Sequence, residues 1–397
     1  DQPYLSDLLD SVARQLYPNR ELIIIDNTNN PAVYELLKAA SEKDAAIKVV
    51  RATTGTSVAA GYHAGIALAT GGYLLFAEED TRLTPNCLAE FALFINRHPA
   101  AAIVYADEDR VEQKGAAVPY FKPGWSPDTL LSRNYIGDAY LIKREQCEQA
   151  GGVQEGYKGN ELYGLLLRAT ELNINIGRIP QVLFHKHSRQ VNETTAVKAL
   201  SDALTRRGTP AVVSTVAGYP GCYNITYEIR QYEKVSIIIP TRDKAGLLQT
   251  AIDSIMQKTN YPDFEVIILN NNSSEASFFE LMQHYQQLYP GRVKCTDAAI
   301  VFNFARLMNI GVEAATGKYV VFCNNDIEVI EQDWMERMVR HAQNKQTGAV
   351  GLQLLYPNNN IQHAGIVLGI NGDAGHAFIN YPAGSSGYQN NLVTATN

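Results

Sequence analysis

The sequence lacks several features that would define its class at once. It has only five cysteines in 397 residues, and none forms a C-x-x-C pair, which argues against a disulfide framework or a zinc site. It has no long basic run and a net charge of −7, so a dedicated nucleic-acid binder is not expected. No apolar run reaches the roughly 18–20 residues that span a bilayer. No strand precedes a G-x-G-x-x-G motif, which excludes the common dinucleotide-dependent oxidoreductases.

What remains is an ordinary globular composition, with 46% hydrophobic and 19% charged residues. A chain of 397 residues has room for two or three domains. Short apolar runs alternate with helical patterns in both halves, starting with a helical pattern from Leu5 and a strand that ends at Asp26. This alternation predicts right-handed βαβ units in an α/β fold, with mostly parallel sheets flanked by helices.

One stretch of the chain occurs twice. Residues 315–326 read Ala-Thr-Gly-Lys-Tyr-Val-Val-Phe-Cys-Asn-Asn-Asp, and residues 69–80 read Ala-Thr-Gly-Gly-Tyr-Leu-Leu-Phe-Ala-Glu-Glu-Asp. Each predicts a turn followed by a buried strand that ends in polar side chains. Ligands of open α/β sheets bind beyond the carboxyl ends of strands, so both ends are candidate sites for a hard cation and the diphosphate that it carries.

The repeat extends well beyond this stretch. The strand that ends at Asp26 and the strand that ends at Asn270 each follow a Tyr-Pro pair. We therefore predict a first domain, a connector and a second domain over residues 1–190, 191–234 and 235–397.

The two copies do not cover the same part of the repeat. The second copy opens with a strand, 235–241, for which the first copy shows no counterpart. The second copy also stops before any counterpart of residues 151–187. From this register we expect the sequence to be clipped at both ends relative to its own repeat.

Several segments together carry a family resemblance. Residues 237–241 read Ile-Ile-Ile-Pro-Thr, and 309–317 contain Asn-x-Gly followed by Ala-Thr-Gly. With the polar and acidic strand ends of the repeat, this pattern resembles glycosyltransferase family 2, whose members have the GT-A fold. The resemblance is nearest to two-domain bacterial members that build O-antigen and other surface polysaccharides, on the segments 302–309, 355–357, 361–365 and 374–378, and 105–109, 120–127 and 134–137 in the first copy.

The resemblance covers nearly all of the chain except the connector and implies two tandem GT-A, or Rossmann-like, domains. It implies an inverting, metal-assisted glycosyltransferase that moves a sugar from a nucleotide-diphosphate sugar to a growing bacterial surface polysaccharide. The residues that it assigns to binding the nucleotide sugar are Asp26, Thr241, Asp243, Asn270, Arg306 and Asn309. The residues that it assigns to a Mg²⁺ or Mn²⁺ ion are Glu78, Asp80, Asn324, Asp326 and His185, of which Asp80 and Asp326 are also catalytic candidates.

An inverting transfer also needs a general base. The resemblance places it at the start of a late helix after a Gly-Gly turn, where this chain has Leu162 and Gly164 in place of two aspartates. Glu161 is our candidate base, although it lies one residue before the position expected for the first aspartate. A shift of one residue along a helix rotates the side chain by about 100° and turns it away from the expected direction. Two alternatives stay open: the first domain is catalytically inactive, or its base lies elsewhere. A candidate for that base is the acidic run 107–109, at the end of a strand that we predict over residues 101–105. The second copy keeps the donor-side residues, so we expect it to be the active one.

The acceptor side is assigned by the same resemblance to Asp107, Asp109, Trp125, His363 and His376. Core packing remains the alternative for Trp125, whose ring could stack on a sugar face. The expected partners are a nucleotide sugar and a lipid-linked or free glycan acceptor, with no nucleic acid. We expect a cytoplasmic protein and leave open a peripheral contact with the inner membrane or with other polysaccharide-assembly proteins.

A second hypothesis belongs to a different class of function. In it the first domain is a degenerate transferase that serves as a scaffold and binds a glycan or a partner protein without catalysis. Transfer or hydrolysis of nucleotide sugars by the two halves would separate the two hypotheses.

Overall fold

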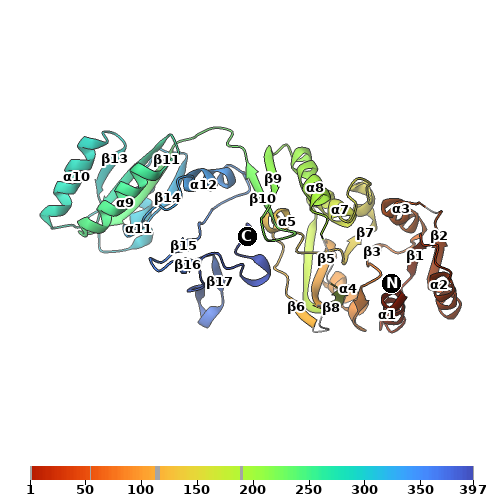
Figure 1. Cartoon of the computed structure of the whole chain (residues 1–397). Helices are drawn as coiled ribbons and strands as arrows, with labels where there is room; N and C mark the ends of the chain where they lie inside the picture. The colour runs from red at the N-terminus through yellow and green to blue at the C-terminus, as the bar shows by residue number, and fades with distance from the viewer. Residues whose placement is uncertain (1, 54, 112–116, 188–190, 397) are drawn as a thin grey trace. The chain divides into compact units, whose positions relative to one another are not determined.

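The computed structural model describes the chain apart from residues 1, 54, 112–116, 188–190 and 397 (Figure 1). It divides into two compact units. Unit 1 comprises Asp1–Thr226 and Gly384–Asn397, and unit 2 comprises Tyr227–Ala383. None of the described helices combines the length and the apolar composition needed to cross a bilayer.

Unit 2 is built on a parallel sheet with the strand order β13-β12-β11-β14. Its strands are β11 (Val235–Thr241), β12 (Phe264–Asn270), β13 (Val293–Asp297) and β14 (Tyr319–Phe322). The apolar runs of β11 and β12 are almost completely buried, as expected for strands that are covered on both faces. The parallel pairing sets Thr241 opposite Asn270, and Asn270 opposite Asp297, so three strands end at one edge.

Helices cover both faces of this sheet. Ile237 and Ile239 pack in one apolar cluster with residues of α9 (Ala245–Lys258), α10 (Ala276–Leu288) and α12 (Trp334–Ala342). Ile238 packs in a second cluster with residues of α11 (Phe304–Ala314). The alternation arises from the period of two in a strand, which turns successive side chains to opposite faces.

The last part of unit 2 contains small antiparallel pairs. β15 (Leu354–Leu355) pairs with β16 (Ile361–His363), and β17 (Ile366–Leu368) pairs with β18 (Ala374–His376). Ile361 is fully buried, whereas β17 is exposed along its whole length.

The larger sheet of unit 1 has the order β3-β7-β5-β8-β4, with β6 added beside β5. Its strands are β3 (Tyr73–Leu75), β4 (Arg82–Leu83), β5 (Ala101–Val111), β6 (Ala117–Tyr120), β7 (Tyr140–Lys143) and β8 (Asn175–His187). The pair β5–β8 is parallel, and the other pairs in this sheet are antiparallel.

The strand that begins at Ala101 is longer than its sequence predicts. We expected it to end at Tyr105 with three acidic residues beyond its end, and this is wrong, because β5 continues to Val111. Asp107, Glu108 and Asp109 therefore lie inside the strand. Pairing with β6 and β8 supplies the backbone hydrogen bonds of this segment. Ion pairs with basic side chains offset the cost of burying the carboxylates of Asp107 and Glu108.

The start of unit 1 repeats the arrangement of unit 2 with one difference. Two parallel strands, β1 (Leu22–Asp26) and β2 (Ile47–Arg51), form a separate sheet next to α1 (Gln2–Ala13), α2 (Pro31–Lys43) and α3 (Val58–Leu68). In unit 2 the strand β11 joins β12 to β14. In the described part of unit 1 no strand takes that place, so β1 and β3 belong to different sheets.

Corresponding side chains make the same hydrogen bonds in the two units. The carboxylate of Glu21 accepts hydrogen bonds from the backbone and hydroxyl of Thr70, at 2.6 and 2.9 Å, and from Lys48. The carboxylate of Glu265 accepts the matching bonds from the backbone and hydroxyl of Thr316, at 2.8 Å each, and from Lys294.

A buried serine gives a second correspondence. The hydroxyl of Ser11 accepts a hydrogen bond from the backbone of Leu83, and that of Ser254 accepts one from the backbone of Val329. Both correspondences support the internal repeat, because they join segments that the repeat aligns.

The segment between the two copies packs with unit 1. Helix α8 (Glu193–Arg206) lies against α7 (Glu161–Ala169) and buries an apolar stripe consisting of Ala196, Ala199, Leu200, Ala203 and Leu204. Strands β9 (Ala211–Thr215) and β10 (Tyr223–Tyr227) pair with each other. The structure thus places most of the residues predicted as a connector, and the last residues of the chain, in unit 1.

The packing of α11 on the sheet gives a test of the fold. A Cβ on Gly311 would overlap the Ile238 side chain and lie 3.1 Å from the Leu269 side chain. We expect Gly311→Ala to destabilise unit 2 by about 1–3 kcal/mol, because this core has no room for a methyl group. The matched control is Gly246→Ala in α9, where nothing lies within 4 Å, and it should stabilise by up to about 1 kcal/mol. Urea unfolding measures both, and equal effects would contradict the packing.

The buried Glu265 carboxylate predicts a dependence of stability on pH. Burial alone would raise its pKa, but hydrogen bonds from Lys294, Ser236 and Thr316 lower the pKa from 4.5 to about 2. The ionised carboxylate therefore stabilises the folded state above pH 4.5, and this contribution disappears as the pH falls towards 2. We expect Glu265→Gln to lower the free energy of unfolding by about 1–3 kcal/mol at pH 7. Urea unfolding between pH 7 and 3 should show the difference from wild type shrinking, and a constant difference would contradict the assignment.

Candidate functional site

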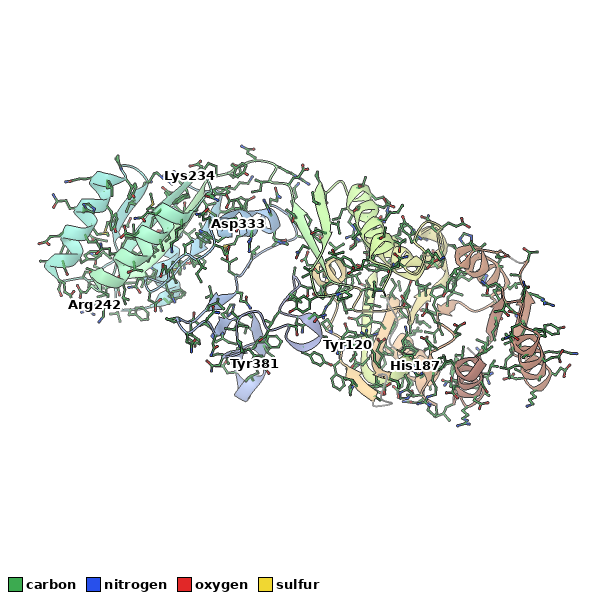
Figure 2. The ribbon with its side chains drawn as sticks, viewed as in Figure 1. Tyr120, His187, Lys234, Arg242, Asp333 and Tyr381 are labelled. Carbon is green, nitrogen blue, oxygen red and sulfur yellow. The ribbon has the colours of Figure 1, made fainter. Side chains whose placement is uncertain are left out.

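Four strand ends of unit 2 meet at the carboxyl edge of its sheet. Thr241 accepts hydrogen bonds from the backbone of Asn271 at 2.8 Å and, at its hydroxyl, from the side chain of Asn325 at 2.9 Å. The side chain of Asn270 donates to Asp297 at 2.9 Å. Figure 2 shows Arg242 at this end of β11 and Lys234 at the opposite end. The residues of β11 and β12 that are predicted to bind the nucleotide sugar thus lie together with the turn after β14.

The loop after β11 has an unusual backbone. Asp243 and Lys244 have φ angles of 53° and 59°, in the left-handed region that residues other than glycine rarely adopt. The Asp243 carboxylate accepts hydrogen bonds from the backbone of Ser274 at 2.7 Å and Glu275 at 2.9 Å, and these bonds hold the pKa of Asp243 below its ordinary value. Asp243 thereby fastens the loop after β11 to the loop after β12. Strained backbone of this kind is often found at ligand sites.

The side chains of the Asn-Asn-Asp turn after β14 point in different directions. Asn325 is turned inward to Thr241, whereas Asn324 and Asp326 lie closer to solvent. Amide and carboxylate oxygens suit a hard cation such as Mg²⁺ or Mn²⁺. No group of three or more His, Cys, Asp or Glu side chains that could hold a metal converges within the described ranges. An ion at Asn324 and Asp326 would therefore also need oxygens from water or from its ligand.

Helix α11 brings two more predicted residues to this edge. Its first turn is capped by Asn303, whose side chain accepts from the backbone of Arg306 at 3.0 Å. The preceding loop is held by Asn271, whose side chain donates to Ile300 at 2.8 Å. Arg306 and Asn309 are both exposed. The first turn of α11 thus places Arg306 beside the carboxyl edge, with Asn309 almost one turn farther along the helix.

In unit 1 Asp26, which is predicted to bind the nucleotide sugar, is buried, with an exposed fraction of 4%. One of its oxygens accepts hydrogen bonds from the backbone and hydroxyl of Thr28, at 2.9 and 2.7 Å. The other oxygen has no hydrogen-bond partner among the described residues. A buried carboxylate oxygen without a donor is costly, so a ligand N–H or O–H would be favourable there.

The predicted metal residues of unit 1 lie on different strands and loops. Asp80 is buried and Glu78 half-buried in the loop between β3 and β4. His185 lies on β8 opposite Arg82 of β4, and its Nδ1 lies 2.7 Å from the Asp109 carboxylate. Only Nε2 of His185 is therefore left for a metal ion.

A cavity of about 240 Å³ lies next to this histidine. It is lined from α1 by Asp7, Asp10, Ser11 and Arg14, from the segment at and after β4 by Arg82, Leu83, Thr84 and Pro85, and from β8 by His185. Its charged lining mixes both signs.

The predicted acceptor residue Asp107 is buried and forms an ion pair with the half-buried Arg178. Both of its oxygens accept from Arg178, at 2.9 and 3.0 Å, and one of them also accepts from the backbone of Lys122. Its exposed fraction is 1%. An acceptor hydroxyl would have to compete with these contacts.

Glu108, on the same strand, pairs with Lys122 at 2.9 Å, and both side chains are almost fully buried. The ammonium group of Lys122 also donates to the backbone oxygen of Ile136 at 2.6 Å. Burial would raise the pKa of Glu108, but Lys122, Lys186 and Arg110 hold it at about 2. The pair thus fixes the segment around Ile136 against β5.

The candidate base Glu161 lies at the first position of α7. Its carboxylate accepts a hydrogen bond from the backbone of Gly159 at 2.7 Å, and the residue is 9% exposed. Leu162 and Gly164 are buried within α7. Glu161 thus fixes the turn before the helix.

The remaining acceptor candidates differ in exposure. Trp125 is 38% exposed. His363 is half-buried and His376 is exposed, and their Nδ1 atoms lie 2.8 Å apart. The structure brings these two histidines together although they lie on different strands.

Comparison with known proteins decides the family. Residues 1–149 and 236–383 both match the family described as Glycosyl transferase family 2. The chain belongs to glycosyltransferase family 2. The resemblance, the GT-A fold class and the enzyme class predicted from the sequence are thereby confirmed.

Among the relatives of this family-2 chain is an O-antigen biosynthesis protein, RfbC, of Myxococcus xanthus. It is 36% identical over 397 residues, which cover 96% of this chain and 31% of the relative. An uncharacterized protein, y4gI, of Sinorhizobium fredii is 31% identical over 98% of this chain and 44% of its own length. The family-2 chain therefore spans less than half the length of either relative.

Solved structures include distant likenesses of this family-2 chain. TarS residues 1–349 of S. aureus in complex with UDP is 18% identical, with a TM-score of 0.43 over 51% of this chain and 62% of that chain. A mannosyltransferase of Pyrobaculum calidifontis in complex with GDP-Man and Mn²⁺ is 14% identical, with a TM-score of 0.40 over 52% and 61% of the two chains.

Sequence reasoning missed several residues that organise these sites. The carboxylates of Glu21 and Glu265 hold the Ala-Thr-Gly turns, and a matching glutamate at the start of two aligned strands was a signal for them. Lys122 was assigned no role, because a lysine between apolar residues gives no sign that it is buried. The pairing of Arg178 with Asp107 spans 71 residues, and no local pattern signals it.

The buried pair of Glu108 and Lys122 predicts a large cost for losing one partner. We expect Lys122→Met to destabilise unit 1 by about 3–5 kcal/mol, because it leaves Glu108 buried with less compensation. The double variant Glu108→Gln/Lys122→Met should recover much of this loss. The matched control is Lys198→Met, which breaks an exposed pair with Asp202 and should cost less than about 1 kcal/mol. Urea unfolding measures all three, and equal costs for the two single variants would contradict the burial.

Proposed function

We propose that unit 2 binds a nucleotide-diphosphate sugar at the carboxyl edge of its sheet and transfers the sugar with inversion. The observation that carries this proposal is the convergence of the ends of β11 and β12 with the turn after β14 at one edge. Thr241, Asp243, Asn270 and Asn325 make hydrogen bonds at this edge, and the exposed Asn324 and Asp326 flank Asn325 in the turn after β14. Family membership supports the reaction class.

The residues divide the work according to their chemistry. Asn270 and Asp243 suit a nucleobase N–H or ribose hydroxyl, through amide and carboxylate oxygens. Asn324 and Asp326 would hold Mg²⁺ or Mn²⁺, which would neutralise the diphosphate as it leaves. Arg306 adds a guanidinium to the same edge and suits phosphate oxygens.

The acceptor that we propose is a growing bacterial surface polysaccharide, lipid-linked or free. The name of the Myxococcus relative, an O-antigen biosynthesis protein, supports this substrate class. Asp107, Asp109, Trp125, His363 and His376 remain candidates for contacts with the acceptor. We propose a cytoplasmic location, and contact with the inner membrane is a further part of this proposal.

Unit 1 has a second candidate function, a non-catalytic scaffold that binds a glycan or a partner. The observation that favours it is the engagement of the candidate base, because Glu161 accepts from Gly159 and is almost buried. Asp107 is likewise occupied by Arg178.

Two isosteric substitutions distinguish the units. In the full chain we expect Asp326→Asn to reduce sugar transfer at least about 100-fold, because the metal loses its charged ligand. Asp80→Asn in unit 1 should leave transfer within about threefold of wild type, a difference of less than about 1 kcal/mol. Transfer or donor hydrolysis is measured with UDP-, GDP- and dTDP-sugars and Mn²⁺.

The control for this experiment is Glu328→Gln, which removes a nearby exposed charge that pairs with Lys258. It should leave transfer unchanged. If Asp80→Asn abolishes transfer and Asp326→Asn does not, the active unit is unit 1 and the proposal for unit 2 fails.

A further inference from the structure

A buried arginine of unit 1 is hydrogen-bonded to a neutral side chain. Arg133 directly follows α5 (Pro127–Ser132) and has an exposed fraction of 6%. Its Nη2 donates a hydrogen bond to the side-chain oxygen of Asn391. Its Nε has no hydrogen-bond partner among the described residues. The guanidinium is therefore buried with one of its donors unused.

A guanidinium in this position is unfavourable without an anion. Arginine keeps its proton in proteins, so the charge of Arg133 cannot be removed by a shift of its pKa. A buried charge is stable only if hydrogen bonds or an opposite charge compensate for the loss of water. A carboxylate or phosphate oxygen accepts a stronger hydrogen bond than the amide oxygen of Asn391. An anion at this place would therefore gain more from Arg133 than Asn391 does.

The surroundings of Arg133 carry an excess of positive charge. Tyr120, labelled in Figure 2, lies next to it: burial raises the pKa of Tyr120, and the charges of Arg133 and Arg110 lower it. Arg110 also lies over the Tyr120 ring, 4.3 Å from its centroid, and Nζ of Lys122 lies 5.9 Å from the same centroid. Glu108 is paired with both Arg110 and Lys122. It is therefore not left to neutralise Arg133.

The segment 384–396 covers this arginine. The hydroxyl of Tyr388 accepts a hydrogen bond from the backbone of Phe121 at 2.8 Å, and Asn391 reaches Arg133 from the same segment. Between these two contacts Gln389 has a φ angle of 51°, in the left-handed region that residues other than glycine rarely adopt. Strained backbone of this kind persists where surrounding contacts hold it. The segment is thus held over Arg133 by a few polar contacts.

Exposed aromatic rings lie in the covering segment and in the loop beneath it. Tyr388 is 42% exposed, Phe121 55% and Trp125 38%. An aromatic ring offers an apolar face on which a sugar ring can stack. A buried cation and exposed rings in one region suit a saccharide that carries an acidic group.

We propose that Arg133 binds an acidic group of a glycan, a carboxylate or a phosphate, whose oxygen replaces that of Asn391. The guanidinium would donate to this group through Nη2 and Nε, the paired geometry in which arginine recognises both kinds of anion. The anion site rests on contacts within unit 1. A glycan as the natural source of the anion rests on the proposed function.

Ligand-observed NMR on the full chain tests the site. The probes are glucuronate, inorganic phosphate and, as a neutral probe, glucose. We expect Arg133→Met to weaken anion binding at least about tenfold. Asn391→Ala should strengthen it about threefold or more, because the anion no longer competes with the amide oxygen. The matched control is Arg97→Met, an exposed arginine at the end of α4 (Cys87–Arg97), which should bind like wild type.

The two anions distinguish the sources of the acidic group. Binding of glucuronate alone identifies a uronic acid, and binding of phosphate alone identifies a phosphorylated or lipid-linked saccharide. Either result supports the anion site.

Three outcomes would overturn the proposal. They are no anion binding by wild type and Asn391→Ala, equal binding of glucose and the anions, and unchanged binding by Arg133→Met. If circular dichroism shows that Arg133→Met does not fold, the gain expected for Asn391→Ala still tests the site, and its absence counts against it. The probes bind without sugar transfer, so loss of the anion site leaves the proposed function of unit 2 standing, and loss of transfer leaves the anion site standing.

Discussion

Pairing of β11 on both of its edges holds unit 2 together. One edge bonds to β12 and the other to β14, so this strand carries the hydrogen bonds that make a single sheet. Its side chains alternate between two apolar clusters, and its last residue, Thr241, receives the two asparagines that shape the site. A ligand site at this edge therefore depends on the placement of one strand.

In unit 1 no described strand fills the position that β11 takes in unit 2, and the sheet is interrupted there. β1 and β2 pair only with each other, and β3 pairs with β7 instead. The clamp of Glu21 on the Ala-Thr-Gly turn nevertheless persists, at the same distances as in unit 2 to within a few tenths of an ångström. A carboxylate that binds a turn thus preserves local geometry even where the sheet is broken.

Much of this architecture was predictable, because the local spacing of apolar residues determines where the helices and strands form. The strands that end at Asp26 and Asn270 are apolar runs bounded by turn residues, and their extents agree with the structure. The strand from Ala101 is longer than its predicted extent. Acidic side chains at 107–109 argue locally against a buried strand, and yet the strand continues through them to Val111. The burial of Asp107 and Glu108 depends on Arg178 and Lys122, which lie 71 and 14 residues away along the chain, so a short sequence window does not reveal it.

The candidate site, like the fold, could be predicted only in part. Positions at strand ends could be named from the sequence, since parallel strands end at a common edge. The hydrogen-bond partners of those positions could not be named, because no local pattern shows that Asn325, between the two exposed residues Asn324 and Asp326, faces Thr241. Glu161 has the right chemistry for a base, and only its contact with Gly159 shows that it is already engaged.

The strand β14 has one further consequence. In the described part of the chain it pairs only with β11, and Val320 and Phe322 on it are 39% and 53% exposed. An apolar strand with a free edge is a template on which other chains can add by backbone pairing. Pairing of another chain at this edge would lower solubility, and a charged residue in place of Phe322 would oppose it.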